Sequence, residues 1–270
     1  MTAIDRLVGQ RIKRREDPRL ITGFGSYVDD VRIPGTLYAA FIRSPHAHAK
    51  LNSINIDAAR GLEGIVTVLT GEDLRGKIGP IPTAVPAQHI PFHPALALGT
   101  VRYVGEPVAV VVGVDPYVCE DAADLIEIDY DPLPAVIDPE AALAPDAPVL
   151  HEEIGSNIAH RVEFSSGDIE QAMRDADKVV KFRLVNQRLA PFAMEPRGML
   201  ANWNPGSSQL TVWVSTQGPH LYRSLLGEVL GLPEHKIRVI AIDVGGGFGA
   251  KMNCYRDEVV TAYLALTLGR

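Results

Sequence analysis

The residues best suited to chemistry lie in the glycine-rich segment 245–251, GGGFGAK. Consecutive glycines let a backbone approach a ligand closely and adopt positive φ, so that successive N–H groups can point at anionic oxygens. The segment follows an apolar run at 237–244 and precedes a helix predicted over 253–268, whose N-terminus would add donors and positive partial charge. The pattern predicts a loop that binds an oxygen-rich ligand; a tight strand-to-helix turn without a ligand is the alternative.

The same segment also fits a dinucleotide site. Gly245, Gly247 and Ala250 match the pattern G-x-G-x-x-G/A after a strand. That fingerprint requires an acidic residue about 20 positions later, at the end of a second strand, and it usually opens its domain. Here a helix is predicted after the loop, and most of the chain precedes it. The match is weak, and a dinucleotide-binding, Rossmann-like oxidoreductase domain stays open as an alternative.

The elements that must position this loop form two blocks, each long enough for a domain with its own core. A proline-rich stretch between them, 132–148, is typical of an extended, exposed connector. We expect an N-terminal arm at 1–19, a mixed α/β domain at 20–131, a connector at 132–156 and a second domain at 157–270.

Within the first block, the apolar run Pro107–Gly113 predicts a strand buried on both faces. A helix at 117–123 and a strand at 125–130 would complete a β-α-β unit. Further predictions are strands at 36–43, 54–56 and 65–69, a helical turn at 57–61 and an irregular loop at 76–100.

Within the second block, Asp168 is suited to cap a helix that runs to residue 175. Alternation of apolar and polar residues over 178–186 predicts a half-buried strand. Other predicted elements are strands at 198–203, 209–215 and 237–244, a helix over Pro219–Leu230 that ends at Gly231, and the final helix at 253–268.

Composition narrows the function classes. The formal net charge is −7 and no basic stripe carries interleaved aromatic residues, which argues against nucleic-acid binding. No stretch is long and apolar enough for a membrane span or a signal peptide. The two cysteines, Cys119 and Cys254, lie too far apart in sequence for a CxxC site, which fits a reducing cytoplasm; Cys254 is expected to be a small core residue.

Several other polar residues are expected to be structural. His46 and His48 could imitate a metal pair, but no third ligand is evident nearby, so we expect packing roles. Glu195 is expected to form a buried ion pair with Arg197 or Arg188.

Separated blocks along the chain, in the same order, resemble the large subunits of the molybdenum hydroxylases, the family of xanthine dehydrogenase, aldehyde oxidase and CO dehydrogenase. They are RREDPRLITGFGSYVDD with RSPHAHAK, YVGEPVAVVV, NQRLAPFAMEPRGMLA at 186–201, STQGPH at 215–220, and VGGGFGAK at 244–251. The 31-residue separation of Gln217 and Phe248 also matches the family's spacing. The resemblance covers nearly all of the chain. It implies an α+β, mixed α/β fold: an a/b hammerhead domain followed by the first part of a molybdopterin-binding domain.

For individual residues, the resemblance implies a cofactor site without direct metal ligands. Gln217 would donate its amide to an oxygen on molybdenum. Phe248 and Gly249 would present backbone N–H groups to the apical oxygen, and Gly246 and Gly247 would shape the turn. Met252 would lie in the substrate pocket, where the purine-oxidising members carry Glu; an apolar residue favours an aldehyde, an N-heterocycle or CO. Glu106 is assigned no role. No catalytic residue is expected in this chain, because the family's general-base Glu would lie downstream.

The resemblance also implies cofactors and partners. The cofactor would be molybdenum–molybdopterin in its cytosine dinucleotide form, with [2Fe-2S] clusters and FAD on partner subunits, in a dimer of heterotrimers. The enzyme would hydroxylate its substrate with water-derived oxygen. The chain corresponds to roughly a third of such a subunit, so we expect it to be inactive without the C-terminal remainder. A non-catalytic remnant or scaffolding module is the further alternative.

Overall fold

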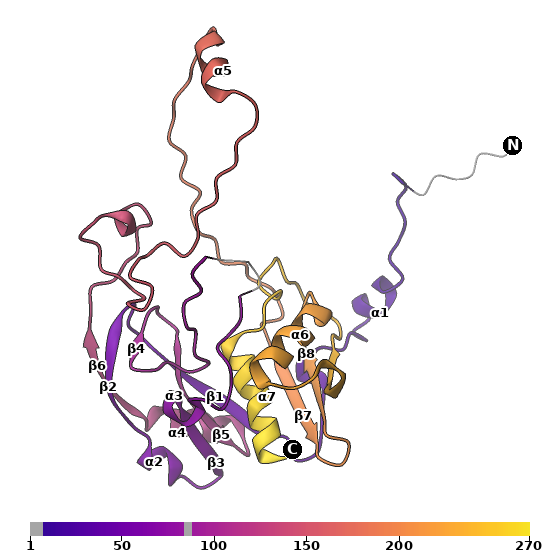
Figure 1. The fold of residues 1–270 in the computed structure, drawn as a ribbon. Coiled ribbons are helices and arrows are strands. Elements are labelled where there is room, and N and C mark those ends of the chain that lie inside the picture. Colours follow the sequence, from indigo (N-terminus) through magenta and orange to yellow (C-terminus); the bar gives the residue numbers. More distant parts are fainter. Residues whose placement is uncertain (1–7, 84–87) are drawn as a thin grey trace, which may run out of the picture.

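The computed structural model describes residues 8–83 and 88–270, so residues 1–7 of the expected N-terminal arm and 84–87 of the expected loop lie outside it. Figure 1 shows one compact body from which two segments project: the N-terminal segment with α1 (Asp17–Ile21) and a long loop that carries α5 (Ile169–Asp175). Among the described residues, no helix is both long and apolar enough to cross a bilayer.

The first half of the chain contains two three-stranded antiparallel sheets. One has the order β1-β5-β3 and the other the order β4-β2-β6. The strands are β1 (Tyr38–Arg43), β2 (Ala49–Asn55), β3 (Ile65–Thr70), β4 (Thr100–Val101), β5 (Pro107–Gly113) and β6 (Glu127–Pro132). The helices are the 3-10 turn η1 (Val28–Asp30), α2 (Asp57–Arg60), α3 (Gly71–Leu74) and α4 (Pro116–Asp124).

Strand β5 is buried along its whole length, as predicted. Val111 packs toward α4, whereas Val110 and Val112 pack into a cluster with residues of the second half of the chain. The predicted β-α-β unit is wrong, because β6 pairs with β2 in the other sheet and runs antiparallel to it. An apolar run shows that both faces are covered, but it does not distinguish parallel from antiparallel neighbours.

The second half builds a third sheet with the order β7-β8-β9. Here β7 (Met199–Asn204) and β8 (Gln209–Val214) form a hairpin, and β9 (Ile237–Ile240) runs parallel to β8 after the crossover helix α6 (Pro219–Leu230). Gly231 ends α6 in the left-handed region, as the sequence predicts. Helix α7 (Arg256–Leu268) packs against β7 and β8. It begins three residues later than expected, and β9 ends four residues earlier, so the connecting loop is longer.

The two halves share a core. Its largest cluster joins Leu74, Leu96 and Val110 of the first half to buried residues of β8, α6 and α7. The proline-rich stretch between the halves is largely exposed and carries only the 3-10 turns η2 (Ala141–Leu143); the turn η3 (Glu234–Lys236) precedes β9. The position of the glycine loop is therefore set by both halves together.

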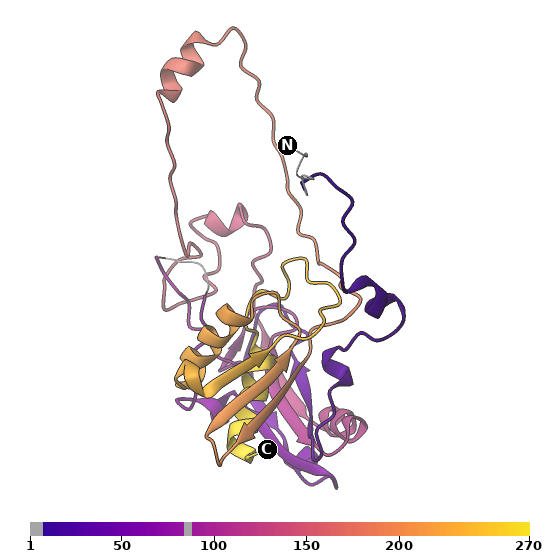
Figure 2. The same ribbon diagram turned by 90° about the vertical axis from the view of Figure 1, so that its right-hand side faces the viewer.

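The projecting arm, residues 159–193, consists of two extended legs joined by α5 (Figure 2). Asp168 caps α5 as predicted, because its carboxylate accepts a hydrogen bond from the Gln171 N–H at 2.8 Å. The predicted half-buried strand at 178–186 is wrong: this leg joins no sheet, and Phe182 and Leu184 are exposed.

Candidate functional site

The glycine loop, residues 245–252, lies in the connection between β9, the last strand of the third sheet, and α7. Its path turns through three positive φ angles: 101° at Gly246, 50° at Phe248 and 87° at Gly249. A non-glycine residue in the left-handed region is uncommon and persists where its surroundings enforce it. The Phe248 side chain is 73% exposed. The loop therefore carries local strain and presents an aromatic ring outward, as functional loops often do.

Gln217 occupies the concave side of this loop. Its Oε1 accepts hydrogen bonds from the Gly249 N–H at 3.0 Å and the Lys251 N–H at 3.3 Å. Its backbone N–H donates to the Lys251 carbonyl at 2.9 Å. A Cβ on Gly247 would lie within 2.5 Å of Gln217 Oε1, so glycine is required there for the two to fit. The structure thus brings together the residues that the sequence predicts for the site, although they lie about 30 positions apart.

This seat orients the Gln217 amide. With the oxygen end held by two N–H groups, the Nε2 end has no protein partner within the described ranges, and neither does the Phe248 N–H. The Gly249 N–H, expected to face a ligand, is instead engaged by Gln217. The site therefore offers neutral N–H donors from Gln217 and Phe248, which suit oxo or other oxygen acceptors without adding a competing charge.

A buried ion pair lies beneath the loop. Lys251 is only 3% exposed, and its Nζ donates to Glu195 Oε2 at 3.0 Å and to the Glu195 carbonyl at 2.8 Å. The same Oε2 accepts from Ser215 Oγ at 2.6 Å and from the Gly245 N–H at 2.8 Å. Burial acts to raise the pKa of Glu195, but the bonds from Ser215, Gly245 and Lys251 outweigh it and lower that pKa. Glu195 thus fixes the start and the end of the loop as a carboxylate.

The sequence analysis missed this arrangement. Glu195 was expected to pair with Arg197 or Arg188, which is wrong, because its partner is Lys251. The available signal was weak: Lys251 is the one charged residue of the block 244–251, whereas Glu195 has two arginines, Arg188 and Arg197, close to it in sequence. Glu195 Oε1 is buried without a hydrogen-bond partner among the described residues. An orphaned carboxylate oxygen beside a binding loop is suited to accept a bond from a ligand N–H or O–H group.

Arg197 instead faces the first turn of α7. It contacts Asp257 at 3.1 Å and Glu258 at 3.3 Å, and its guanidinium lies over the Tyr255 ring at 3.9 Å. Burial raises the pKa of Glu258 to about 7. Burial also acts to raise the pKa of Asp257, but hydrogen bonding and attraction to Arg197 lower it overall.

The N-terminus of α7 was expected to add positive partial charge to the site, and the structure argues against this. The Glu258 carboxylate accepts a bond from the Tyr255 N–H, and Asp257 adds another acidic group in the first turn. Acidic side chains already occupy this end of the helix, so a diphosphate there would meet like charge. The dinucleotide alternative is therefore disfavoured by the charges around α7.

The two histidines that could imitate a metal pair make packing contacts. His48 Nδ1 contacts the Pro134 carbonyl at 2.8 Å, and the His46 ring lies against Tyr130 at 4.8 Å. Among the described residues no three His, Cys, Asp or Glu side chains gather as a metal site. Cys254 is buried, but it precedes α7 rather than lying within it. Met252 is 40% exposed at the end of the loop, where it can contact a bound molecule.

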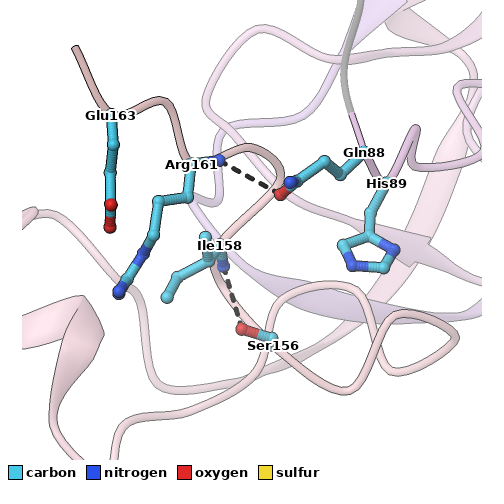
Figure 3. Close-up of a pocket in the computed structure, with 6 residues that line it drawn as sticks. All are labelled: Gln88, His89, Ser156, Ile158, Arg161 and Glu163. Carbon is cyan, nitrogen blue, oxygen red and sulfur yellow. Dashed lines mark hydrogen bonds between the residues drawn. The ribbon is translucent and has the colours of Figure 1, made fainter. Parts of the chain in front are cut away.

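Two hollows lie away from this loop. One, of about 520 Å³, is open to solvent and is lined by Gln88, His89, Ser156, Ile158, Arg161 and Glu163 (Figure 3). None of the predicted site residues lines it. The second, of about 600 Å³, lies between residues 27–41, the start of β7 and the C-terminal part of α7, and it touches the site only through Glu195. The glycine loop and Gln217, rather than either hollow, form the candidate site.

Comparisons with known proteins identify the family of the chain. Residues 22–134 match the model described as aldehyde oxidase and xanthine dehydrogenase, a/b hammerhead domain, and residues 150–270 match the molybdopterin cofactor-binding domain. The CO dehydrogenase large chain of Afipia carboxidovorans is 38% identical over 97% of this chain and 34% of its own length. The xanthine dehydrogenase molybdenum-binding subunit of Escherichia coli O157:H7 is 36% identical over 92% of this chain and 33% of its own length.

Solved structures show the same relationship. Quinoline 2-oxidoreductase from Pseudomonas putida 86 superposes with a TM-score of 0.88 at 35% identity, over 96% of this chain and 33% of that one. The chain thus spans about a third of the length of these relatives. With its hammerhead and molybdopterin-binding domains in the same order as the sequence predicts, the chain belongs to the large-subunit family of the molybdenum hydroxylases.

Proposed function

We propose that this chain supplies the first cofactor contacts of a molybdenum hydroxylase, with Gln217 and the glycine loop as the binding elements. The observation that carries the proposal is the seating of Gln217: Gly249 and Lys251 hold its oxygen, which leaves its Nε2, like the Phe248 N–H, without a partner among the described residues. Gly246 and Gly247 give the loop its turn and its room for Gln217. The N–H donors of Gln217 and Phe248 suit the oxygen atoms of a molybdenum–molybdopterin group, for which we propose the cytosine dinucleotide form.

When bound, that group supplies the two-electron redox centre of a hydroxylation that takes its oxygen from water. The part played by this chain is to bind and orient. Gln217 and Phe248 donate N–H bonds to oxygens of the cofactor, and Glu195 with Lys251 keeps the loop in place from below. A preorganised donor of this kind needs no rearrangement when charge develops on the acceptor. No residue of this chain is proposed as the proton acceptor of the reaction.

Met252 restricts the substrate in this proposal. Its thioether side chain offers no charge to a polar purine, whereas it suits an aldehyde, a neutral N-heterocycle or CO. Relatives named for CO, xanthine and a nicotine derivative all resemble this chain at 36–38% identity, so overall similarity does not choose among these substrates. Met252 is therefore the feature of this chain on which our choice depends.

The proposed setting is a cytoplasmic complex. Electrons would pass to [2Fe-2S] clusters and FAD on partner subunits, in a dimer of heterotrimers. One relative, from Paenarthrobacter nicotinovorans, is named as the gamma subunit of a dehydrogenase complex, which supports a multi-subunit assembly. We expect the 270-residue chain alone to show no substrate-dependent dye reduction. Turnover by the purified chain, free of any larger subunit, would contradict this expectation.

The site is tested in the complete complex by measuring molybdenum content and turnover for two variants. Gln217→Ala removes one hydrogen bond to a strongly polar oxygen, worth ~1.5–3 kcal/mol. If that bond strengthens in the transition state, the rate falls roughly 10- to 150-fold, at 1.36 kcal/mol per decade. Gly249→Val places a β-branched residue at a φ of 87°, so we expect loss of bound molybdenum. Gln171→Ala, on the exposed helix α5, is the matched control. If both site variants kept full molybdenum content and full activity, the loop would be a turn with no role in cofactor binding, and the proposal would be wrong.

A further inference from the structure

Residues of the first half of the chain hold both ends of the glycine loop. Before the loop, Asp243 accepts hydrogen bonds from the Ser26 N–H at 2.8 Å and from Arg19 Nη2 at 2.7 Å, and its own N–H donates to the Ser26 carbonyl. After the loop, the first two residues of α7, Arg256 and Asp257, are bound from the first half as well. The contacts of Arg256 are the more deeply buried.

Arg256 is held by Glu106, the residue directly before β5. Glu106 is 2% exposed, and its Oε1 accepts a bond from Arg256 Nη1 at 2.6 Å. Its Oε2 accepts from the Arg102 N–H at 2.6 Å, so both oxygens are satisfied. Arg256 also donates to the Pro94 carbonyl at 2.8 Å. A buried charge pair with complete hydrogen bonding fixes direction as well as distance, because either partner left alone would be a buried unpaired charge.

Asp257 is held by Arg43 at the end of β1. Arg43 Nη2 lies 3.0 Å from Asp257 Oδ2, and Arg43 Nη1 donates to the Gly105 carbonyl at 3.2 Å. Gly105 and Glu106 are neighbours in sequence: Gly105 holds Arg43, which contacts Asp257, and Glu106 contacts Arg256 directly. The two contacts with α7 therefore end on neighbouring residues of its first turn. Two attachments to one helical turn prevent it from pivoting about either of them.

This turn of α7 is connected to the loop through Tyr255. The Tyr255 hydroxyl donates to the Ala250 carbonyl at 2.7 Å. Ala250 lies between Gly249 and Lys251, whose N–H groups hold the Gln217 oxygen. A displacement of Arg256 would therefore be passed through one adjacent side chain to the two N–H groups that seat Gln217.

We propose that Glu106 is a positioning residue for the glycine loop: through Arg256 and Tyr255 it fixes the N–H groups that hold Gln217. The first domain is then part of the binding site's support, although it contributes no residue to the site itself. The simpler alternative is that Glu106 only joins the two halves of the chain. The two roles differ in where the chain loosens when the pair is broken.

The experiment is amide hydrogen exchange, resolved by residue, on the chain with Glu106→Gln. We expect exchange at Gly249 and Lys251 to be at least about tenfold faster, with the amide of Val110 in the central strand changed by less than about twofold. Glu120→Gln, on the exposed face of α4 in the same domain, is the control and should change none of these amides. Unchanged rates at Gly249 and Lys251, or equal acceleration at Val110, would overturn the proposal.

A double-mutant cycle tests the route. If Glu106 acts through Arg256, Glu106→Gln combined with Arg256→Gln should accelerate the two loop amides no more than the more severe single variant. Additive effects would show that Glu106 acts by another path. Should Glu106→Gln fail to fold, Tyr255→Phe decides instead, because it removes only the hydroxyl bond to the Ala250 carbonyl on the proposed route and leaves no buried charge. Faster exchange at Gly249 and Lys251 supports the proposal, and no change overturns it.

This inference rests on the proposed function only for its consequence in the assembled enzyme. There, Glu106→Gln should also reduce bound molybdenum. A loop that exchanges faster but retains all of its molybdenum would contradict the proposed function and leave the positioning role intact.

Discussion

Gly247→Ala is the most direct perturbation of the contact between the loop and Gln217. A Cβ at position 247 would lie 2.5 Å from Gln217 Oε1 and 2.7 Å from its Cγ, which is closer than any real contact. The backbone at Gly247 does not lie in the left-handed region, so alanine itself is tolerated. The Gln217 side chain must therefore leave its seat.

The cost follows from the bonds that are lost. Gln217 Oε1 gives up two accepted hydrogen bonds, each worth a net ~0.5–1.5 kcal/mol. Alanine lowers the entropy of the unfolded chain, which offsets about 0.4–1 kcal/mol. We expect the free energy of unfolding to fall by roughly 1–2 kcal/mol, measured by urea denaturation.

The decisive comparison is the same substitution with Ala at position 217. Without the amide there is no clash and no bond to lose, so Gly247→Ala should then cost less than about 0.5 kcal/mol. Gly249→Ala serves as the control, since its Cβ meets no atom within 4 Å but its φ of 87° strains any side chain, at ~1–2 kcal/mol in both backgrounds. An equal cost of Gly247→Ala in both backgrounds would refute our account of the seat.

Three further predictions concern the rest of the chain. Burial raises the folded pKa of Glu258 from 4.5 to about 7, so the stability that protonated Glu258 contributes is complete below pH 4.5 and is lost as the pH rises through 7. Relative to Glu258→Gln, the free energy of unfolding of the wild type should therefore fall by roughly 3 kcal/mol over that range. Parallel pH profiles of the two proteins would contradict this. Burial raises the pKa of the Cys254 thiol to about 12, so iodoacetamide should modify it only at the rate of unfolding, as peptide mapping would show. Trypsin should cut first in the arm at 159–193, which is exposed and rich in basic residues, because the connector segment 132–148 contains no Lys or Arg. The exposure of that connector is tested separately with a protease that cuts after Glu140. A first cut inside the buried strand Pro107–Gly113, by either protease, would contradict the expectation.

Local patterns predicted much of the fold. The apolar run of β5, the glycine at the end of α6 and the cap at Asp168 each depend on neighbours in sequence, and each is confirmed. The failures concern partners that are distant in sequence. Alternation at 178–186 shows which face of a strand would be buried, but it cannot show whether another strand is present to pair with it.

The candidate site divides in the same way. The meeting of Gln217 with the loop followed from a resemblance that preserves order and spacing. The pair of Glu195 and Lys251 did not, because their contact spans 56 residues and requires the hairpin of β7 and β8 to bring the two blocks together. Glu106 was assigned no role for a related reason. Its partner, 150 residues away, becomes visible only when the two halves share a core.

The arm at 159–193 has a consequence for how molecules of this chain behave in solution. Its second leg carries four basic side chains, Lys178, Lys181, Arg183 and Arg188, on a chain whose net charge is −7. It also exposes apolar side chains on a backbone that no sheet pairs, the combination by which strand edges attach to other chains. At low ionic strength the basic leg of one molecule is attracted to the acidic body of another. At 0.1 M salt this attraction is largely screened beyond a separation of about 10 Å. In concentrated samples, association between molecules should therefore be weakest at moderate salt. Repulsion between the acidic bodies is also screened there, but the attraction of the arm to a neighbouring molecule is lost.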